Sequence, residues 1–205
     1  MTDDPTVYVV DDIDSNRVLL QNLIESVDIA VETYVSARAF LEAFEGDERT
    51  ACLLLDIRMP DMSGLELQKE LNARGVTIPI IFVTAHGDVP VTIQAMKEGA
   101  FDFVQKPFNN QAVLDQVFKA LEESERRKKS AKNKTEVLAR MEVLTPRERD
   151  VMEHVVQGEP NKRIAYNLDI SERTVEIHRS RMMEKMQAAS LADLVRMAVL
   201  VEDDD

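Results

Sequence analysis

The chain has 205 residues, of which 44% are hydrophobic, and this composition excludes a largely disordered protein. No apolar run approaches the ~20 residues of a membrane span, the acidic N-terminus lacks the basic start of a secretory signal, and a single cysteine excludes an internal disulfide, so we expect a cytoplasmic protein. The formal net charge of -13 falls entirely on residues 1–123, whereas residues 124–205 hold 16 acidic and 16 basic residues. This asymmetry predicts two domains with separate functions.

Strand and helix patterns alternate five times over the first 120 residues. The strands are expected at 6–10, 30–34, 51–55, 79–83 and 101–104, and the helices from 15, at 36–44, 65–73 and 89–98, and from about 109. Short apolar runs of this kind are typical of parallel strands that are buried on both faces. The alternation predicts an α/β doubly wound parallel sheet with helices on both faces.

Polar side chains follow four of these strands at the point where each strand ends. They are Asp11, Asp12, Asp56, Thr84 and Lys106. In open α/β sheets, ligands bind outside the carboxyl ends of the strands, so we expect these side chains to share one site. Three carboxylates with one lysine leave a local charge of about -2, which is costly without a cation. Oxygen ligands predict Mg²⁺ or Mn²⁺.

This site predicts phosphoryl transfer, because positioning and charge neutralisation are the main requirements of that reaction. Asp56 is the expected acceptor, a carboxylate nucleophile that forms an acyl phosphate. We expect Lys106 to pair with one phosphoryl oxygen and the Thr84 hydroxyl to donate to another. Ala85 is small and leaves the site open to a phosphodonor or to water.

The C-terminal part reads as a linker followed by four short helices. Residues 121–134 are highly charged, lack Gly and Pro, and place acidic before basic residues, which favours a solvated helix over a flexible linker. The helices are expected at 146–157, 160–168, 172–186 and 190–200. A tight turn at 169–171 joins the second to the third, and this arrangement describes a helix-turn-helix.

The third of these helices has the pattern of a DNA-reading helix. Val175, Met182 and Met186 form its buried stripe, while Ile177 lies among polar residues on the opposite side, where it can meet a thymine methyl group in the major groove. The expected phosphate contacts are Arg173, Arg179, Arg181 and Lys185 on this helix and Asn161, Lys162 and Arg163 at the start of the preceding helix. His178 fits equally a packed histidine and a phosphate contact.

Residues 5–122 resemble the receiver domain of two-component response regulators. The resemblance rests on Asp11-Asp12, on residues 56–64, on residues 84–88 and on Lys106-Pro107-Phe108. It implies the strand order 2-1-3-4-5, which the flavodoxin-like folds show. It further implies Mg²⁺ on Asp11, Asp12, Asp56 and the backbone carbonyl of Arg58, a sensor histidine kinase as phosphodonor and a cis Lys106–Pro107 bond. On phosphorylation, Thr84 would shift and Phe103 would turn inward, whereas His86 is expected to be a loop residue.

The C-terminal helices resemble the output domain of LuxR-type regulators, and the combination resembles the FixJ-type branch of the response regulators. The matching segments are 144–149, 161–165 and 170–179. The resemblance implies base contacts from Glu176, Ile177 and Ser180, and backbone contacts from Thr174, His178 and Arg181. It places dimer contacts on residues 191–200. The implied division is a receiver domain at 1–122, a linker at 123–142 and a DNA-binding domain with an acidic tail at 143–205.

The favoured function is a phosphorylation-activated DNA-binding transcriptional regulator. Phosphorylation of Asp56 would drive homodimerisation, through the fourth helix and fifth strand, and promoter binding. One alternative is a Mg²⁺-dependent phosphohydrolase, although such enzymes usually carry a second acid where Arg58 stands. The other alternative is a phosphorylated adaptor that does not bind DNA. We expect double-stranded DNA as a partner, no membrane and no enzymatic turnover.

Overall fold

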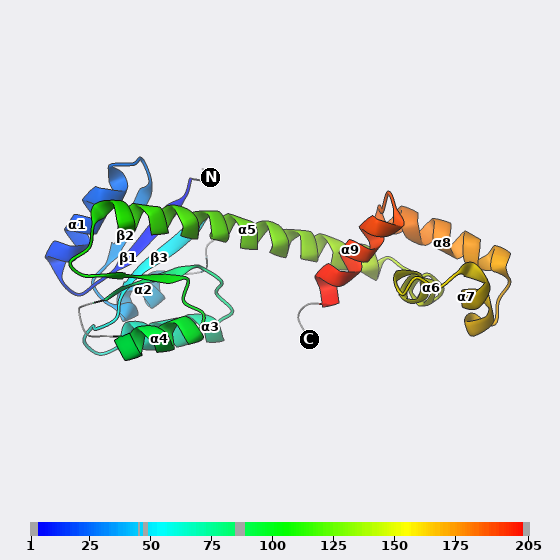
Figure 1. The fold of residues 1–205 in the computed structure, drawn as a ribbon, viewed down its shortest axis with the longest axis horizontal. Helices are drawn as coiled ribbons and strands as arrows, with labels where there is room; N and C mark the ends of the chain where they lie inside the picture. Colours follow the sequence, from blue (N-terminus) through cyan, green and yellow to red (C-terminus); the bar gives the residue numbers. More distant parts are fainter. Residues whose placement is uncertain (1–3, 45, 47–48, 85–88, 203–205) are drawn as a thin grey trace. The chain divides into compact units, whose positions relative to one another are not determined.

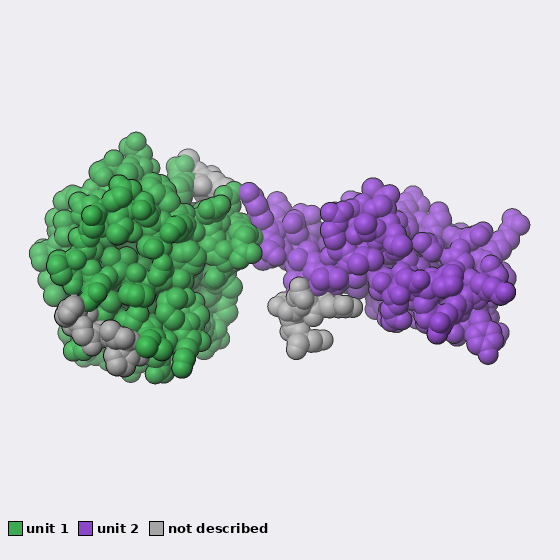
Figure 2. All heavy atoms as spheres, in the orientation of Figure 1, with its two compact units in different colours: residues 1–128 green, residues 129–205 purple. Residues whose placement is uncertain are grey.

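The structure is a computed structural model that describes residues 4–44, 46, 49–84 and 89–202, without the side chains of Val89, Pro90 and Glu202. The chain divides into two compact units, Met1–Lys128 and Lys129–Asp205, which Figure 2 shows in green and purple. In the described part of the chain, no helix is long and apolar enough to cross a membrane.

Unit 1 contains a five-stranded parallel sheet in the order β2-β1-β3-β4-β5 (Figure 1). The strands are β1 (Thr6–Val10), β2 (Ala30–Tyr34), β3 (Ala51–Asp56), β4 (Ile80–Thr84) and β5 (Asp102–Gln105), and the helices are α1 (Asp14–Glu25), α2 (Ala37–Ala43), α3 (Gly64–Ala73), α4 (Val89–Lys97) and α5 (Asn110–Glu142). The predicted fold class and strand order are therefore confirmed. Each predicted strand lies within one residue of its observed bounds.

Two cores cover the two faces of this sheet, because successive side chains of a strand point to opposite faces. On β1, Val7 and Val9 pack with α1 and α5. Tyr8 and Val10 pack on the other face with α2, α3 and α4, where Phe40 is fully buried. Burial on both faces explains why the strands read as continuous apolar runs.

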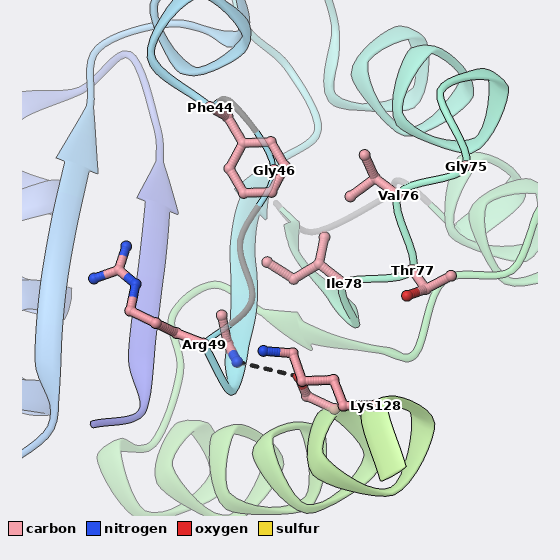
Figure 3. Close-up of a pocket in the computed structure, with 10 residues that line it drawn as sticks. Phe44, Gly46, Arg49, Gly75, Val76, Thr77, Ile78 and Lys128 are labelled. Atoms are coloured by element: carbon pink, nitrogen blue, oxygen red, sulfur yellow. Dashed lines mark hydrogen bonds between the residues drawn. The ribbon is translucent and has the colours of Figure 1, made fainter. Parts of the chain in front are cut away.

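The part of α5 that packs within unit 1 extends beyond residue 123, where the sequence predicted the linker to begin. Ser124 is buried, and its hydroxyl accepts a hydrogen bond of 3.1 Å from the backbone N–H of Ala51, the first residue of β3. Arg127 donates to the carbonyl of Thr77 at 3.0 Å. A cavity of about 240 Å³ lies beside these contacts, lined by Phe44, Val76 and Ile78 among others (Figure 3). It lies at the start of β3, whereas Asp56 ends that strand.

Unit 2 contains the end of α5 and the helices α6 (Pro146–Val156), α7 (Asn161–Leu168), α8 (Glu172–Met186) and α9 (Leu191–Glu202). Thr145 and Glu148 form a capping box at the start of α6, and Ser171 caps α8. The core includes Val137 of α5 together with Val175, Met182 and Met186, the stripe predicted for α8. The predicted helices thus begin and end within two residues of the observed ones.

Candidate functional site

The carboxyl ends of β1, β3, β4 and β5 bring four of the predicted polar residues to one edge of the sheet. The Lys106 ammonium donates to Asp11 Oδ2 at 2.8 Å and to Asp56 Oδ1 at 2.6 Å. The backbone N–H of Lys106 donates to the carbonyl of Thr84 at 2.7 Å. Asp11, Asp56 and Thr84 are all buried. Lys106 lies 95 residues from Asp11 and 50 residues from Asp56 in the chain, yet the three side chains form one polar cluster.

Asp11 is held in place by residues that the sequence analysis did not identify. The Asn16 amide donates to both carboxylate oxygens of Asp11, at 3.1 and 3.0 Å, and the Ile13 N–H donates to Oδ1 at 2.9 Å. Arg17 donates to the backbone carbonyl of Asp11 at 2.7 Å. Asn16 and Arg17 lie in the first turn of α1, and only their spacing of five and six residues from Asp11 signals this role.

Asp56 has one oxygen directed at Lys106 and the other bonded to the chain. Oδ2 accepts from the backbone N–H of Arg58 at 2.7 Å. Burial raises the pKa of Asp56, and the hydrogen bond and charge of Lys106 oppose that rise without cancelling it. Burial lowers the pKa of Lys106, but its bonds to Asp11 and Asp56 outweigh that effect and leave the pKa raised. The pKa of both partners is therefore raised, that of Asp56 chiefly by burial and that of Lys106 by its two bonds to carboxylates.

The turn between β3 and α3 requires glycine at position 64. A Cβ at this position would lie 2.3 Å from the backbone carbonyl oxygen of Asp56 and 3.0 Å from the Phe82 ring. The Gly64 N–H donates to the carbonyl of Ile57 at 3.0 Å, and Ser63 with Glu66 caps α3 directly beside it. The close approach of α3 to β3 therefore fixes the backbone that carries Asp56.

The remaining predicted residues of this site are exposed or lie outside the described residues. Asp12 is exposed, and Phe103 is 45% exposed on β5. Within the described ranges, no three Asp, Glu, His or Cys side chains form a group that could hold a metal ion. The expected meeting of three carboxylates thus differs from what we observe: Lys106 bonds both Asp11 and Asp56, whereas Asp12 is exposed. Ala85 and His86 lie outside the described residues. The Lys106–Pro107 bond is cis.

Helices α7 and α8 form the second cluster of predicted residues. Asp169, in the left-handed conformation (φ 54°), ends α7 and leads into the turn before α8. Arg179 of α8 donates to the Asn161 side chain at the start of α7 at 3.0 Å, so these two predicted phosphate contacts are joined. Opposite the buried stripe, Ile177 is 45% exposed. An apolar side chain is therefore presented among polar ones, as the sequence predicted.

The predicted DNA-contacting residues differ in their exposure. Exposed ones are Lys162, Arg163, Arg173, Glu176, Ile177, Ser180 and Arg181, and half-buried ones are Asn161, Thr174, His178, Arg179 and Lys185. Lys185 is engaged within the domain, because its ammonium donates to Glu148 Oε2 at 2.6 Å. Thr174 shares a hydrogen bond of 2.7 Å with the Ser171 hydroxyl at the start of α8. The exposed set is therefore accessible to a ligand, although Arg163 also pairs with Glu159 at 3.5 Å.

Comparison with known proteins assigns both parts of the chain to families. Residues 7–118 match the response regulator receiver domain, and residues 142–198 match the luxR family of bacterial regulatory proteins. The chain belongs to the response regulators. Its architecture of a receiver with a LuxR-type domain, shared with regulators named FixJ, makes it a phosphorylation-activated transcriptional regulator.

Several known proteins resemble the chain over nearly its whole length. The transcriptional regulatory protein FixJ of Azorhizobium caulinodans is 48% identical over 95% of this chain and 92% of its own. Nodulation protein W of Bradyrhizobium diazoefficiens is 45% identical over 94% and 84%. Among solved structures, the response regulator StyR aligns with a TM-score of 0.79 at 44% identity, covering 96% of this chain and 98% of StyR. Full-length FixJ from B. japonicum aligns at 0.60 and 40%, covering 98% of both chains.

The donor set of the receiver site suits a divalent metal ion. Response regulator receiver domains generally bind Mg²⁺ for phosphorylation, and the residues here offer the carboxylates of Asp11 and Asp56 and the carbonyl of Arg58, all hard oxygen donors. Asp12 adds a carboxylate next to Asp11 in the chain. Two buried carboxylates beside a single ammonium also retain a net negative charge that a cation would neutralise.

Proposed function

We propose that Asp56 accepts a phosphoryl group from a sensor histidine kinase. The observation that carries this proposal is the Asp56 carboxylate at the end of β3, bonded by one oxygen to Lys106. Its raised pKa reflects a desolvated carboxylate, and desolvation makes the anion the less stable and more reactive form. The other oxygen is oriented by the Arg58 N–H, which fixes the plane of the nucleophile.

The chemistry assigned to the side chains follows from their positions. An Asp56 oxygen forms the new O–P bond as the N–P bond to the kinase histidine breaks, and the departing imidazole takes up a proton. Lys106 then pairs with a phosphoryl oxygen in place of the Asp56 oxygen, and the Thr84 hydroxyl donates to a second one. We assign Mg²⁺, or Mn²⁺, to Asp11, Asp12, Asp56 and the Arg58 carbonyl, where it supplies charge neutralisation for the incoming anion.

We assign DNA reading to the exposed face of α8. Glu176, Ile177 and Ser180 would contact base edges, and Arg173, Arg181 and Lys162 would contact phosphates. Asn161 and Arg179, joined by their hydrogen bond, would form one phosphate contact together, with Thr174 and His178 beside it. Two such domains on adjacent half-sites require a homodimer.

We assign dimerisation after phosphorylation to exposed apolar residues of α4 and β5. Ile93 and Met96 on α4 and Phe103 on β5 are 52%, 40% and 45% exposed. In unit 2, α9 exposes Leu191 and Val199, two turns apart on one side of the helix. The proposed division of labour is phosphoryl acceptance by residues 1–122, coupling by 123–142 and DNA binding by 143–205, in the cytoplasm and without enzymatic turnover of a substrate.

Labelling with a small phosphodonor tests the proposal. Wild-type protein incubated with acetyl phosphate and Mg²⁺ should gain one phosphoryl group by intact mass spectrometry, and Asp56→Ala should gain none. Equal labelling of both proteins would exclude Asp56. A promoter footprint that phosphorylation strengthens, and that Ile177→Ala weakens, would exclude the adaptor alternative. Turnover of a generic phosphate ester would instead favour the phosphohydrolase, which nothing in the described residues supports, since Arg58 stands where the second acid is expected.

A further inference from the structure

Lys185 of α8 lies at a junction of three helices rather than on the exposed face of α8. Its ammonium donates to Glu148 Oε2 at 2.6 Å and to the backbone carbonyl of Val143 at 3.2 Å. Val143 follows the end of α5, and Glu148 lies in the first turn of α6. One side chain of the DNA-reading helix thus bonds both sides of the turn between α5 and α6.

Glu148 is a buried charge that depends on this contact. Its side chain is 4% exposed, and that of Lys185 is 32% exposed. The hydrogen bond from Lys185, followed by that from the Thr145 N–H, lowers the pKa of Glu148 to about 2, so the carboxylate is ionised. A buried carboxylate that loses its cationic partner is strongly destabilised, and the local structure must rearrange to hydrate it.

A second contact joins the end of α5 to the end of α8. Arg140 donates to the backbone carbonyl of Met186, the last residue of α8, at 3.3 Å. A cation at this position satisfies an orphan carbonyl and complements the helix dipole. Arg149 of α6 likewise donates to the carbonyl of Met141 near the end of α5 at 3.2 Å. Lys185, Arg140 and Arg149 thus link α5, α6 and α8 to one another.

We propose that Lys185 is a positioning residue, which sets α8 against the α5–α6 turn through Glu148 and does not bind a DNA phosphate. The inference rests on the proposed reading of DNA by α8. In this role, Lys185 connects the end of α5 directly to α8, within the same compact unit. This role also removes one basic residue from the phosphate contacts that the sequence indicates for α8.

The test separates the two roles by salt dependence and by rescue. The probe is a 30-base-pair duplex that the wild-type protein, treated with acetyl phosphate, selects from a random pool. Lys185→Gln in the full chain should weaken binding by about tenfold, because Glu148 is left without its cation. The slope of log affinity against log salt should stay at the wild-type value, since a slope change of about one is expected only when a phosphate contact is lost. Circular dichroism verifies folding at the assay temperature.

The double variant Glu148→Gln/Lys185→Gln is the decisive comparison. It lacks the same ammonium but also lacks the buried charge, so binding should return to within about threefold of wild type. A slope reduced by about one, or a double variant no better than the folded single variant, would overturn the inference. So would wild-type affinity in folded Lys185→Gln. If the single variant does not fold, the double variant alone tests the inference: its affinity should lie within about threefold of wild type and its salt slope should be unchanged.

Arg181→Gln, on the exposed side of α8, is the matched control for a true phosphate contact. Its slope should fall by about one. An unchanged slope in Arg181→Gln would contradict the phosphate contact assigned under the proposed function. The affinity of the double variant Glu148→Gln/Lys185→Gln would still test the role of Lys185. The two ideas therefore fail in different measurements.

Discussion

At the scale of single residues, Asp56, the proposed phosphoryl acceptor, is a buried carboxylate whose ionisation is unfavourable. Its pKa is raised by burial, with Lys106 opposing, so folding favours the protonated form. The stability contributed by a raised carboxyl pKa is fully present below the unfolded value of about 4 and is lost as the pH rises through the folded value. As the pH rises and Asp56 loses its proton, the buried carboxylate therefore lowers the stability of the fold.

Asp56→Asn should relieve this cost in a pH-dependent way. We expect the thermal unfolding midpoint of unit 1 to rise by about 2–4 °C at pH 7, with the gain shrinking as the pH is lowered toward 4. Scanning calorimetry at several pH values measures the effect. Asp12→Asn removes an exposed carboxylate at the same edge and should give no comparable gain. A gain that is constant with pH, or a lower midpoint for Asp56→Asn, would contradict the assigned origin of the pKa shift.

At the scale of elements, the approach of α3 to β3 holds Asp56, the proposed acceptor, in position. Gly64→Ala places a Cβ 2.3 Å from the Asp56 carbonyl oxygen, so the turn must move. We expect slower labelling of Asp56 by acetyl phosphate, by about tenfold or more, because small misplacements of reacting groups cost large factors in rate. Ser63→Ala is the neighbouring control, since it removes the cap of α3 and should cost about 1 kcal/mol of stability while labelling stays close to wild type. Equal labelling rates for the two variants would show that the turn does not position Asp56.

The bounds of the elements were largely predictable from sequence, because strand burial, capping residues and glycines are local signals. Thr145-Pro146 and Ser171 marked the starts of α6 and α8, and both caps are present. The extent of α5 in unit 1 was not predictable. Ser124 reads as one more polar residue of a solvated helix, and only the position of Ala51 in the folded sheet turns it into a buried partner.

For the candidate sites, the sequence predicts which residues lie at the strand ends and on the helix faces, but not the contacts between their side chains. The edge of the sheet brings Asp11, Asp56 and Lys106 together, because parallel strands end on the same side. Which oxygen meets which nitrogen depends on tertiary packing. For that reason the role of Asn16 and the pairing of Lys185 with Glu148, 37 residues away, were missed.

At the scale of the whole molecule, charge separates the two functions along the chain. The first half carries the net negative charge and the proposed phosphorylation site, and the output half without its tail carries an excess of basic residues, which a duplex attracts. The acidic half therefore repels the DNA that the output half attracts. Coupling between them must then come from assembly or from α5, which contributes to the cores of both units.

Assembly gives the last prediction. Phosphorylated wild-type protein should sediment as a dimer, and Ile93→Glu should remain monomeric although Asp56 is fully labelled, because a charge would be buried in an apolar contact. Val35→Glu is the matched control: Val35 is an exposed aliphatic residue of unit 1, 57% exposed against 52% for Ile93, and its variant should dimerise like wild type. Analytical ultracentrifugation with intact mass spectrometry reads both properties in one sample. A dimer of labelled Ile93→Glu would place the interface away from α4, and the exposed residues of α9 would then be the surface to substitute, beginning with Val199→Glu.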